Sequence, residues 1–328
     1  MSEVVSASIA TSSAWLQANL QAAFDGIPFA IVATGVLAAA SAALLGTFLV
    51  VKGQAMLTDA ISHGIVLGIA ATYLVAHVTS GPWQLLGAGL IGLVTVLATE
   101  ALAASRRVKR DAATGLVFPA LFAAGVLLLS LYARDVHVDP HTVLLGEIGF
   151  VWLDRVAVAG LEVPRALLTL AIVLVVDVLY VLAFAKELVA SAFDPVLARN
   201  LGLRPRLVHA GLLTLTSVTA VAAFDAVGVV LFVAFAIVPA VTGQLVANRF
   251  GGVMTVALLC AAGAALAGYP TAVAADVSIG GTMAALTGVP LVIALVATRL
   301  QRRRGGAPRD RPTGGRSGER ALGIGEMS

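Results

Sequence analysis

Long hydrophobic runs recur along nearly the whole chain, separated by short polar connections. The runs cover residues 29–51, 57–77, 84–104, 112–133, 166–185, 207–224, 226–247, 252–272 and 283–299. Each is close to the roughly 20 residues that a helix needs to cross the hydrocarbon core of a bilayer. None shows the alternation of polar and apolar positions that is typical of a barrel strand. The pattern therefore predicts nine membrane-spanning helices, or eight if one of the short runs does not cross.

The composition agrees with this pattern. Of the 328 residues, 59% are hydrophobic and 12% are charged, and the mean hydropathy is +0.98. Because the apolar runs are not confined to the start of the chain, a cleaved signal peptide does not explain them. We expect an all-α polytopic membrane protein that contacts lipid and no nucleic acid. The single cysteine, Cys260, excludes an internal disulfide and a cysteine-based metal cluster.

The basic residues indicate how the chain is oriented. Eighteen of the 21 lysines and arginines fall on one set of connections and in the C-terminal tail, whereas the opposite set holds only Arg134, Arg155 and Arg165. By the positive-inside rule the first set is cytoplasmic. We expect a multi-pass protein of the cell inner membrane with a cytoplasmic C-terminus, and nine spans would place the N-terminus outside.

Three regions are expected along the chain. Residues 1–28 form an N-terminal segment with an interfacial helix around Trp15 to Phe24, and residues 29–300 form the transmembrane domain. Residues 301–328 are rich in Arg, Gly and Pro and predict a disordered basic cytoplasmic tail. Within the membrane domain, Val143 to Leu153 predicts a re-entrant or interfacial helix.

The strongest chemical signal is an acid and an imidazole four residues apart in an otherwise apolar run. On a helix, Asp59 and His63 lie on one face, so a carboxylate oxygen and a ring nitrogen can approach the same ion. One interpretation is a pair of metal ligands on a transport pathway, because charge at membrane depth usually marks function. The other is an Asp–His hydrogen bond that holds two helices together. Counting from Lys52 places Asp59 toward the cytoplasmic half, unless the span tilts or follows a re-entrant stretch.

A second cluster lies in the long external segment 134–165. It combines hard carboxylates with imidazoles, which suits manganese, iron or zinc. The alternative is a solvated acidic loop that covers helix ends. The residues are Asp135, His137, Asp139, His141 and Glu147.

Further polar residues lie within or beside the spans. Glu100 and Asp177 fall inside apolar runs, whereas Asp225 and Asp276 lie near outer ends. His209 begins a span on the cytoplasmic side, where a surface or phosphate-binding role is expected. If Asp59, Asp177 and Asp225 relay protons, the chain is a proton-coupled secondary metal transporter that needs no ATPase.

The chain contains no G-x-x-x-x-G-K-[ST] loop, so it cannot bind nucleotide by that route and is not expected to be an enzyme. An ATP-driven transporter built on it would need a separate motor. The cytoplasmic segment 186–203 is the expected contact. Asp194 and Pro195 predict a helix start, Val196, Leu197 and Leu201 form an apolar face, and Gly202 predicts the stop. Such a helix fits a groove on a partner protein, or else lies flat on the membrane.

Several stretches, in a consistent order, resemble the permease subunits of ABC-type importers for manganese, zinc and iron, from about Phe29 to Leu300. The most specific are D-x-x-S-H at 59–63 and F-D-P-x-x-A-x-x-L-G at 193–202. The others are Leu45 to Val51, Asp111 to Phe118, Leu144 to Glu147, and Val227 to Ala240.

This resemblance implies roles for the motifs. Asp59 and His63 would be pathway ligands or gate residues for the metal, which is substrate rather than a permanently bound cofactor. The segment with Phe193, Asp194, Pro195, Ala198, Leu201 and Gly202 would couple to an ATP-binding subunit. The implied partners also include an extracytoplasmic metal-binding protein and a second permease chain, identical or related. Leu145 to Phe150 and Ala222 to Gly228 resemble the manganese and iron branch more than the zinc branch.

Overall fold

The computed structural model describes residues 26–77, 82–105, 107–132, 148–158 and 160–305. The interfacial helix expected around Trp15 to Phe24 and the tail beyond residue 305 lie outside these ranges. So do residues 133–147, which hold all five residues of the external acidic and histidine cluster.

The described part of the chain contains nine helices that are long and apolar enough to cross a membrane, which agrees with the larger of the two expected numbers. They are α2 (Ile27–Val51), α3 (Met56–Ala76), α4 (Pro82–Ala104), α5 (Arg110–Tyr132), α7 (Arg165–Ala183), α10 (Pro205–Val227), α11 (Val229–Val246), α12 (Phe250–Ala275) and α13 (Ile279–Gly305). The shorter elements are η1 (Ile148–Phe150), α8 (Ala185–Phe193), α9 (Pro195–Asn200), β1 (Arg155–Val158) and β2 (Leu161–Pro164).

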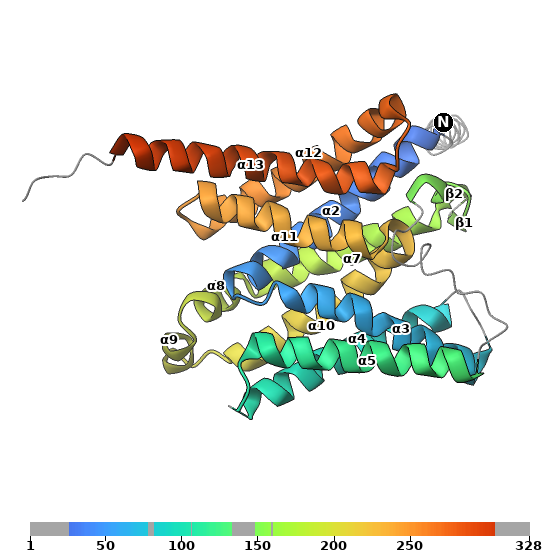
Figure 1. Cartoon of the computed structure of the whole chain (residues 1–328), viewed down its shortest axis with the longest axis horizontal. Coiled ribbons are helices and arrows are strands. Elements are labelled where there is room, and N and C mark those ends of the chain that lie inside the picture. The colour runs from blue at the N-terminus through green and yellow to red at the C-terminus, as the bar shows by residue number, and fades with distance from the viewer. Residues whose placement is uncertain (1–25, 78–81, 106, 133–147, 159, 306–328) are drawn as a thin grey trace, which may run out of the picture.

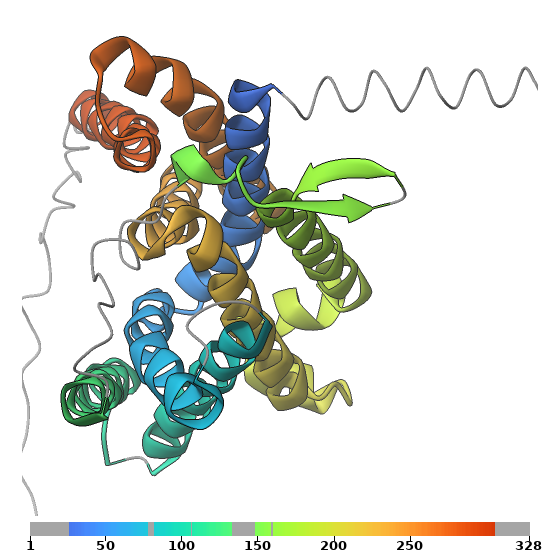
Figure 2. The same cartoon turned by 90° about the vertical axis from the view of Figure 1, so that its right-hand side faces the viewer.

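The spans form two groups that meet through α10 and through the contact of α11 with α3. Helices α3, α4 and α5 pack together on one side, and α2, α11, α12 and α13 pack together on the other. Helix α10 contacts both groups, and α7 lies against α2 and α10. Figure 2 shows the two groups nearly end-on, with α10 crossing between them. The helix that carries Asp59 and His63 is thus held in the smaller group.

Large apolar side chains fill the seam between the groups. Phe232 and Phe235 of α11 are almost fully buried, as are Ile61 of α3 and Leu213 of α10. Lipid is as apolar as these side chains, so close van der Waals packing, rather than exclusion of water, holds the spans together. Small residues make that packing possible. At Gly46 of α2, a Cβ atom would overlap the backbone carbonyl of Ala236 in α11.

The two ends of the bundle differ. Helices α8 and α9 lie at the same end as the C-terminal end of α13, and the β1–β2 hairpin lies at the other (Figure 1). The hairpin is antiparallel, with Arg155 opposite Pro164, and an ion pair of 3.8 Å between Arg165 Nη1 and Asp154 Oδ2 lies beside it. The positive-inside rule predicts that the α8–α9 end is cytoplasmic.

Two local expectations differ from the structure. The sequence did not indicate the hairpin, because four-residue strands are too short to show a periodic pattern. In the stretch expected as a re-entrant or interfacial helix, the described residues 148–153 hold only the single turn η1. At the other end of the chain, α13 continues to Gly305, five residues beyond the last residue assigned to the transmembrane domain.

We expect Gly46→Ala to destabilise the protein by about 1–3 kcal/mol, because the added methyl group forces α2 away from α11. The measurement is the thermal unfolding midpoint of the purified chain in detergent. Gly263→Ala on α12 is the matched control, since a Cβ there meets open space. Equal midpoints for the two variants would contradict the close approach at Gly46.

Candidate metal pathway and coupling surface

Asp59 and His63 form a close pair on α3. The distance from His63 Nε2 to Asp59 Oδ1 is 3.5 Å. Two donors bound to one metal at about 2.1 Å and at a tetrahedral angle lie about 3.4 Å apart. The pair can therefore bind one cation with little change in either side chain.

Aromatic side chains from α5 surround the imidazole. The ring of His63 stacks on Phe118 at a centroid distance of 5.5 Å, and Phe122 meets it edge-on at 5.7 Å. These contacts orient the ring so that its Nε2 atom faces Asp59. The sequence analysis missed this pair of phenylalanines, although their spacing of four residues on a helix places them on one face.

The pair is only partly covered within one chain. The side chain of His63 is 33% exposed and that of Asp59 is 44% exposed. Within the described residues, no third histidine, cysteine or acid joins them to complete a metal-binding group. Half-exposed ionisable groups on a membrane helix face a water-filled cavity or another protein surface rather than lipid. One chain therefore supplies two donors and leaves the rest of the ligand shell to another source.

The depth of the pair follows from where α3 begins. The helix starts at Met56, so Asp59 lies in its first turn. The described chain enters α3 directly through a tight turn after α2, with no re-entrant stretch between them. Asp59 thus lies near the N-terminal end of its span, which the positive-inside rule predicts to be cytoplasmic.

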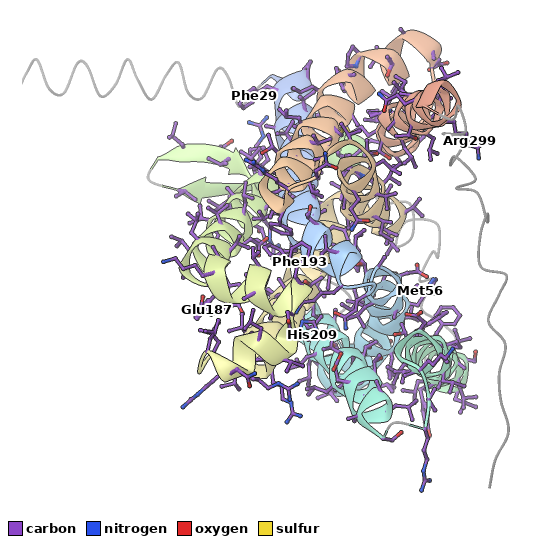
Figure 3. All side chains as sticks on the ribbon, turned by 90° about the vertical axis from the view of Figure 1, so that its left-hand side faces the viewer. Phe29, Met56, Glu187, Phe193, His209 and Arg299 are labelled. Carbon is purple, nitrogen blue, oxygen red and sulfur yellow. The ribbon has the colours of Figure 1, made fainter. Side chains whose placement is uncertain are left out.

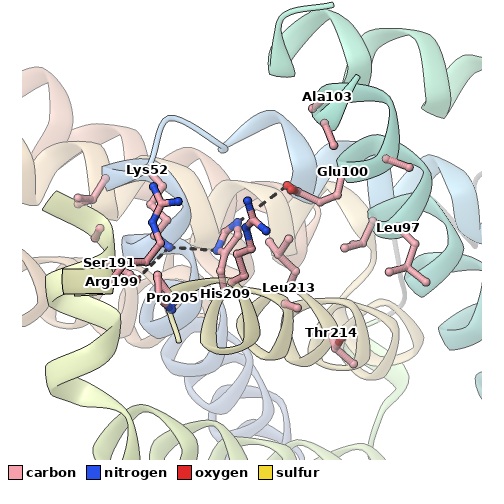
Figure 4. Close-up of a pocket in the computed structure, with 17 residues that line it drawn as sticks. Lys52, Leu97, Glu100, Ala103, Ser191, Arg199, Pro205, His209, Leu213 and Thr214 are labelled. Carbon is pink, nitrogen blue, oxygen red and sulfur yellow. Dashed lines mark hydrogen bonds and ion pairs between the residues drawn. The ribbon is translucent and has the colours of Figure 1, made fainter. Parts of the chain in front are cut away.

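A cavity of about 990 Å³ opens near this end of the bundle, between the end of α2, α4, α8 and the start of α10. Figure 4 shows the charged groups that line it. Lys52 Nζ lies 3.1 Å from His209 Nδ1 and 3.3 Å from Ser191 Oγ, and His209 Nε2 lies 3.9 Å from Glu100 Oε1. Arg199 and Arg206 line the same cavity.

His209 was expected to have a surface or phosphate-binding role; the surface position is wrong, and the phosphate-binding role stays a prediction. Its side chain is 13% exposed and lies between Lys52 and Glu100. Since an ammonium group can only donate, His209 Nδ1 accepts from Lys52 and the ring proton is on Nε2, which faces the carboxylate. In this tautomer His209 is not a metal ligand. The contact spans 157 positions of the sequence, so no local pattern could reveal it.

Asp177 lies in a different environment. Its side chain is fully buried in α7, and Thr219 of α10 donates its hydroxyl to both carboxylate oxygens at 3.0 and 3.1 Å. Ser41 of α2 adjoins the same carboxylate without a hydrogen bond of normal geometry. No hydrogen bond in the described part of the chain joins Asp177 to Asp59 or to Asp225 at the outer end of α10. Asp177 braces α7 against α10.

The segment 193–202 is well ordered in its backbone and exposed in its apolar side chains. Asp194 caps α9, its Oδ1 atom accepting hydrogen bonds from the backbone N–H groups of Val196 at 2.9 Å and Leu197 at 2.8 Å. Gly202 ends the turn with a φ of +78°. Ala198 is buried, whereas Phe193 and Leu201 are each 66% exposed. Figure 3 shows the molecule from this end.

The helix start and stop expected in this segment are therefore confirmed. Its exposed side chains form one apolar patch, which we name the α9 patch and which consists of Phe193, Val196, Leu197 and Leu201. The external cluster of Asp135, His137, Asp139, His141 and Glu147 lies outside the described residues, and its metal-binding role stays a prediction.

Residues 24–298 match the model of the ABC 3 transport family. The chain belongs to this family. The chain is 43% identical over 260 residues to the manganese transport system membrane protein MntD of Bacillus subtilis, covering 79% of this chain and 88% of that protein. It is 42% identical over 259 residues to the zinc transport system membrane protein TroD of Treponema pallidum, covering 79% and 71% of the two chains.

The fold is also that of a solved transporter. A chain in the structure of PsaBC from Streptococcus pneumoniae in complex with Fab superposes with a TM-score of 0.68 at 23% identity, covering 84% of this chain and 94% of that one. The family match and the two relatives confirm the resemblance drawn from the motifs. The protein is a member of a family of metal ABC transporter permeases, and its architecture is of that type.

The Asp177 brace leads to a stability prediction. Thr219→Val keeps the shape of the side chain and removes the hydroxyl that donates to both oxygens of the buried carboxylate, so we expect a loss of about 1–3 kcal/mol. The thermal unfolding midpoint in detergent measures it. Thr255→Val on α12 is the control, because that exposed hydroxyl donates only to Gly251 O of its own helix. A midpoint for Thr219→Val equal to that of the control would exclude the brace.

Proposed function

We propose that the chain is the membrane subunit of an ATP-driven importer that moves a divalent metal cation, manganese or iron in preference to zinc, into the cytoplasm. The observation that carries the proposal is the half-exposed Asp59–His63 pair, whose 3.5 Å separation fits two ligands of one cation. Membership of the ABC 3 transport family supports the ATP-driven mechanism over the proton-coupled alternative.

The incomplete ligand shell supports a dimer of permease chains. Two copies that face each other through α3 would bring two carboxylates and two imidazoles around one ion. That set meets the four-coordinate requirement that one chain cannot meet. It also covers the exposed fraction of both side chains, which would otherwise face lipid at a cost of several kcal/mol per charge.

Neither donor chemistry nor the names of the relatives selects one metal. Mixed carboxylate and imidazole ligands suit manganese, iron and zinc. One relative is named for manganese and another, of almost equal identity, for zinc. Our preference for manganese or iron comes from the motifs around Leu145 to Phe150 and Ala222 to Gly228.

Coupling to ATP hydrolysis is assigned to the α9 patch. The patch is apolar, lies at the expected cytoplasmic end, and is held in a fixed orientation by the Asp194 cap and the Gly202 turn. An apolar helix face of this kind fits a groove on an ATP-binding subunit. An extracytoplasmic metal-binding protein would deliver the ion at the opposite end. Alternation between two packings of the helices would then expose the Asp59–His63 pair to each side in turn.

We expect Asp59→Ala and His63→Ala each to lower manganese uptake at least about tenfold, because each removes a direct ligand. Uptake is measured in cells that also express the ATP-binding and metal-binding subunits, with the amount of permease quantified. Asp276→Asn, an exposed carboxylate at the outer end of α12, is the control and should leave uptake unchanged. Full uptake by a normally expressed Asp59→Ala protein would rule out the ligand role.

The cap on α9 gives a test of coupling. Asp194→Ala removes both hydrogen bonds of the cap and costs the helix about 1 kcal/mol, so we expect metal-dependent ATP hydrolysis by the assembled transporter to fall several-fold. Asp194→Asn keeps an oxygen that caps equally well, so hydrolysis should stay near the wild-type rate. If the two variants lose hydrolysis equally, the cap is not what positions the coupling surface.

A further inference from the structure

A small void lies at the cytoplasmic end of the α3–α5 group, separate from the large cavity. It is enclosed by the α2–α3 turn, the end of α4 and the start of α5, and its volume is about 10 Å³. That is close to the least volume that holds one water molecule or one small ion. Its polar lining consists of Gln54, Thr99, Glu100, Asp111 and Thr114.

Two buried oxygens at this void have no hydrogen-bond partner among the described residues. Gln54 is 4% exposed, and its Nε2 atom donates to Glu100 Oε1 at 3.4 Å, whereas its Oε1 atom accepts no hydrogen bond. Thr99 is 2% exposed, and its Oγ1 atom is likewise without a hydrogen bond. A buried polar group without a partner costs about 1–3 kcal/mol, so two at one void indicate that a ligand satisfies them.

The backbone holds Gln54 firmly in place. Gly53 has a φ of +69°, a conformation that side chains rarely adopt, and it allows the chain to turn sharply after α2. The N–H of Gln54 then donates to Leu49 O at 2.8 Å. The backbone of Gln54 is thereby fixed beside the void, and the hydrogen bond to Glu100 holds its buried side-chain amide there.

The charges at the void favour a cation. Glu100 and Asp111 are the two carboxylates that line it, and no basic residue lines it within the described chain. His209 Nε2 lies 3.9 Å from Glu100 Oε1, and both residues line the large cavity. The side chain of Glu100 is 32% exposed, and Asp111 is exposed at the first turn of α5. An ion can therefore enter from the cytoplasmic end of the bundle.

We propose that this void is a second cation site, at which Glu100, Asp111, Gln54 and Thr99 bind a small divalent cation through oxygen atoms alone. Carboxylate, amide and hydroxyl oxygens are the ligands that Mg²⁺ and Mn²⁺ accept. The set differs from the Asp59–His63 pair, which adds an imidazole. The bound ion ties the beginning of α3 to α4 and α5, the helix that contacts His63. Metal on the cytoplasmic side thereby fixes the arrangement of the helices around the pathway pair.

The test uses the full chain in lipid nanodiscs. The protein carries Asp59→Ala and His63→Ala, so that the pathway pair is absent, and the probe is Mn²⁺ alone. Electron paramagnetic resonance follows Mn²⁺ binding. We expect Glu100→Gln and Asp111→Asn each to weaken at least tenfold one Mn²⁺ site that shows no coupling to nitrogen. Excess Mg²⁺ should displace Mn²⁺ from that site. Glu187→Gln on α8, a carboxylate at the same end that does not line the void, should leave it unchanged.

Three results would overturn the proposal. The first is that Glu100→Gln and Asp111→Asn bind Mn²⁺ as the Glu187→Gln control does, which would mean that the void holds water only. The second is that the affected site shows nitrogen coupling, which would place the ion on a histidine. The third is that Mg²⁺ does not compete. Because the protein lacks the pathway pair and the assay uses no ATP, its outcome is independent of the uptake test of the proposed function.

Discussion

The hydrocarbon core of a bilayer offers no hydrogen-bond partners, and the rest of this structure follows from that constraint. Every backbone N–H and C=O group within a span must bond inside its own helix. All the described spans are helices, and the strands of the described residues, β1 and β2, lie at the end of the bundle opposite α8 and α9. Polar side chains meet the same requirement, so they are found where helices face one another or where water can enter.

The polar groups within the bundle consequently fall into distinct environments. Asp177 is buried between α7 and α10, where one threonine hydroxyl donates to both of its carboxylate oxygens. This arrangement suits a structural contact that holds the two helices together. The Asp59–His63 pair is half-exposed, and its ring is held by Phe118 and Phe122, which suits an ion that binds and leaves. The groups around Glu100 lie at the end of the bundle that carries α8, where a cavity lined by basic residues and a small polar void share one carboxylate.

Two features of the single chain are incomplete without a partner. The pathway pair has two donors where a metal needs at least four, and the α9 patch exposes apolar side chains at an end that faces water. The proposed function explains both features by assembly, the first with a second permease chain and the second with an ATP-binding subunit. Membership of the ABC 3 transport family agrees with such an assembly.

The sequence by itself determined the class of the protein, the spans and the helix ends. These features depend on local signals, namely runs of about 20 apolar residues, the Asp194 cap and the Gly202 stop. Each signal is contained in one short segment of the chain. The same locality explains why Asp59 and His63 could be paired from a spacing of four.

Only the tertiary structure decided which distant residues meet. Lys52 and His209 are 157 positions apart in the sequence, and Asp177 and Thr219 are 42 positions apart. Each of these contacts depends on how whole helices pack. Packing in a membrane is set by shape at small residues such as Gly46, and hydropathy carries no information about it. The aromatic surround of His63 and the oxygen-lined void at Gln54 are therefore products of the fold.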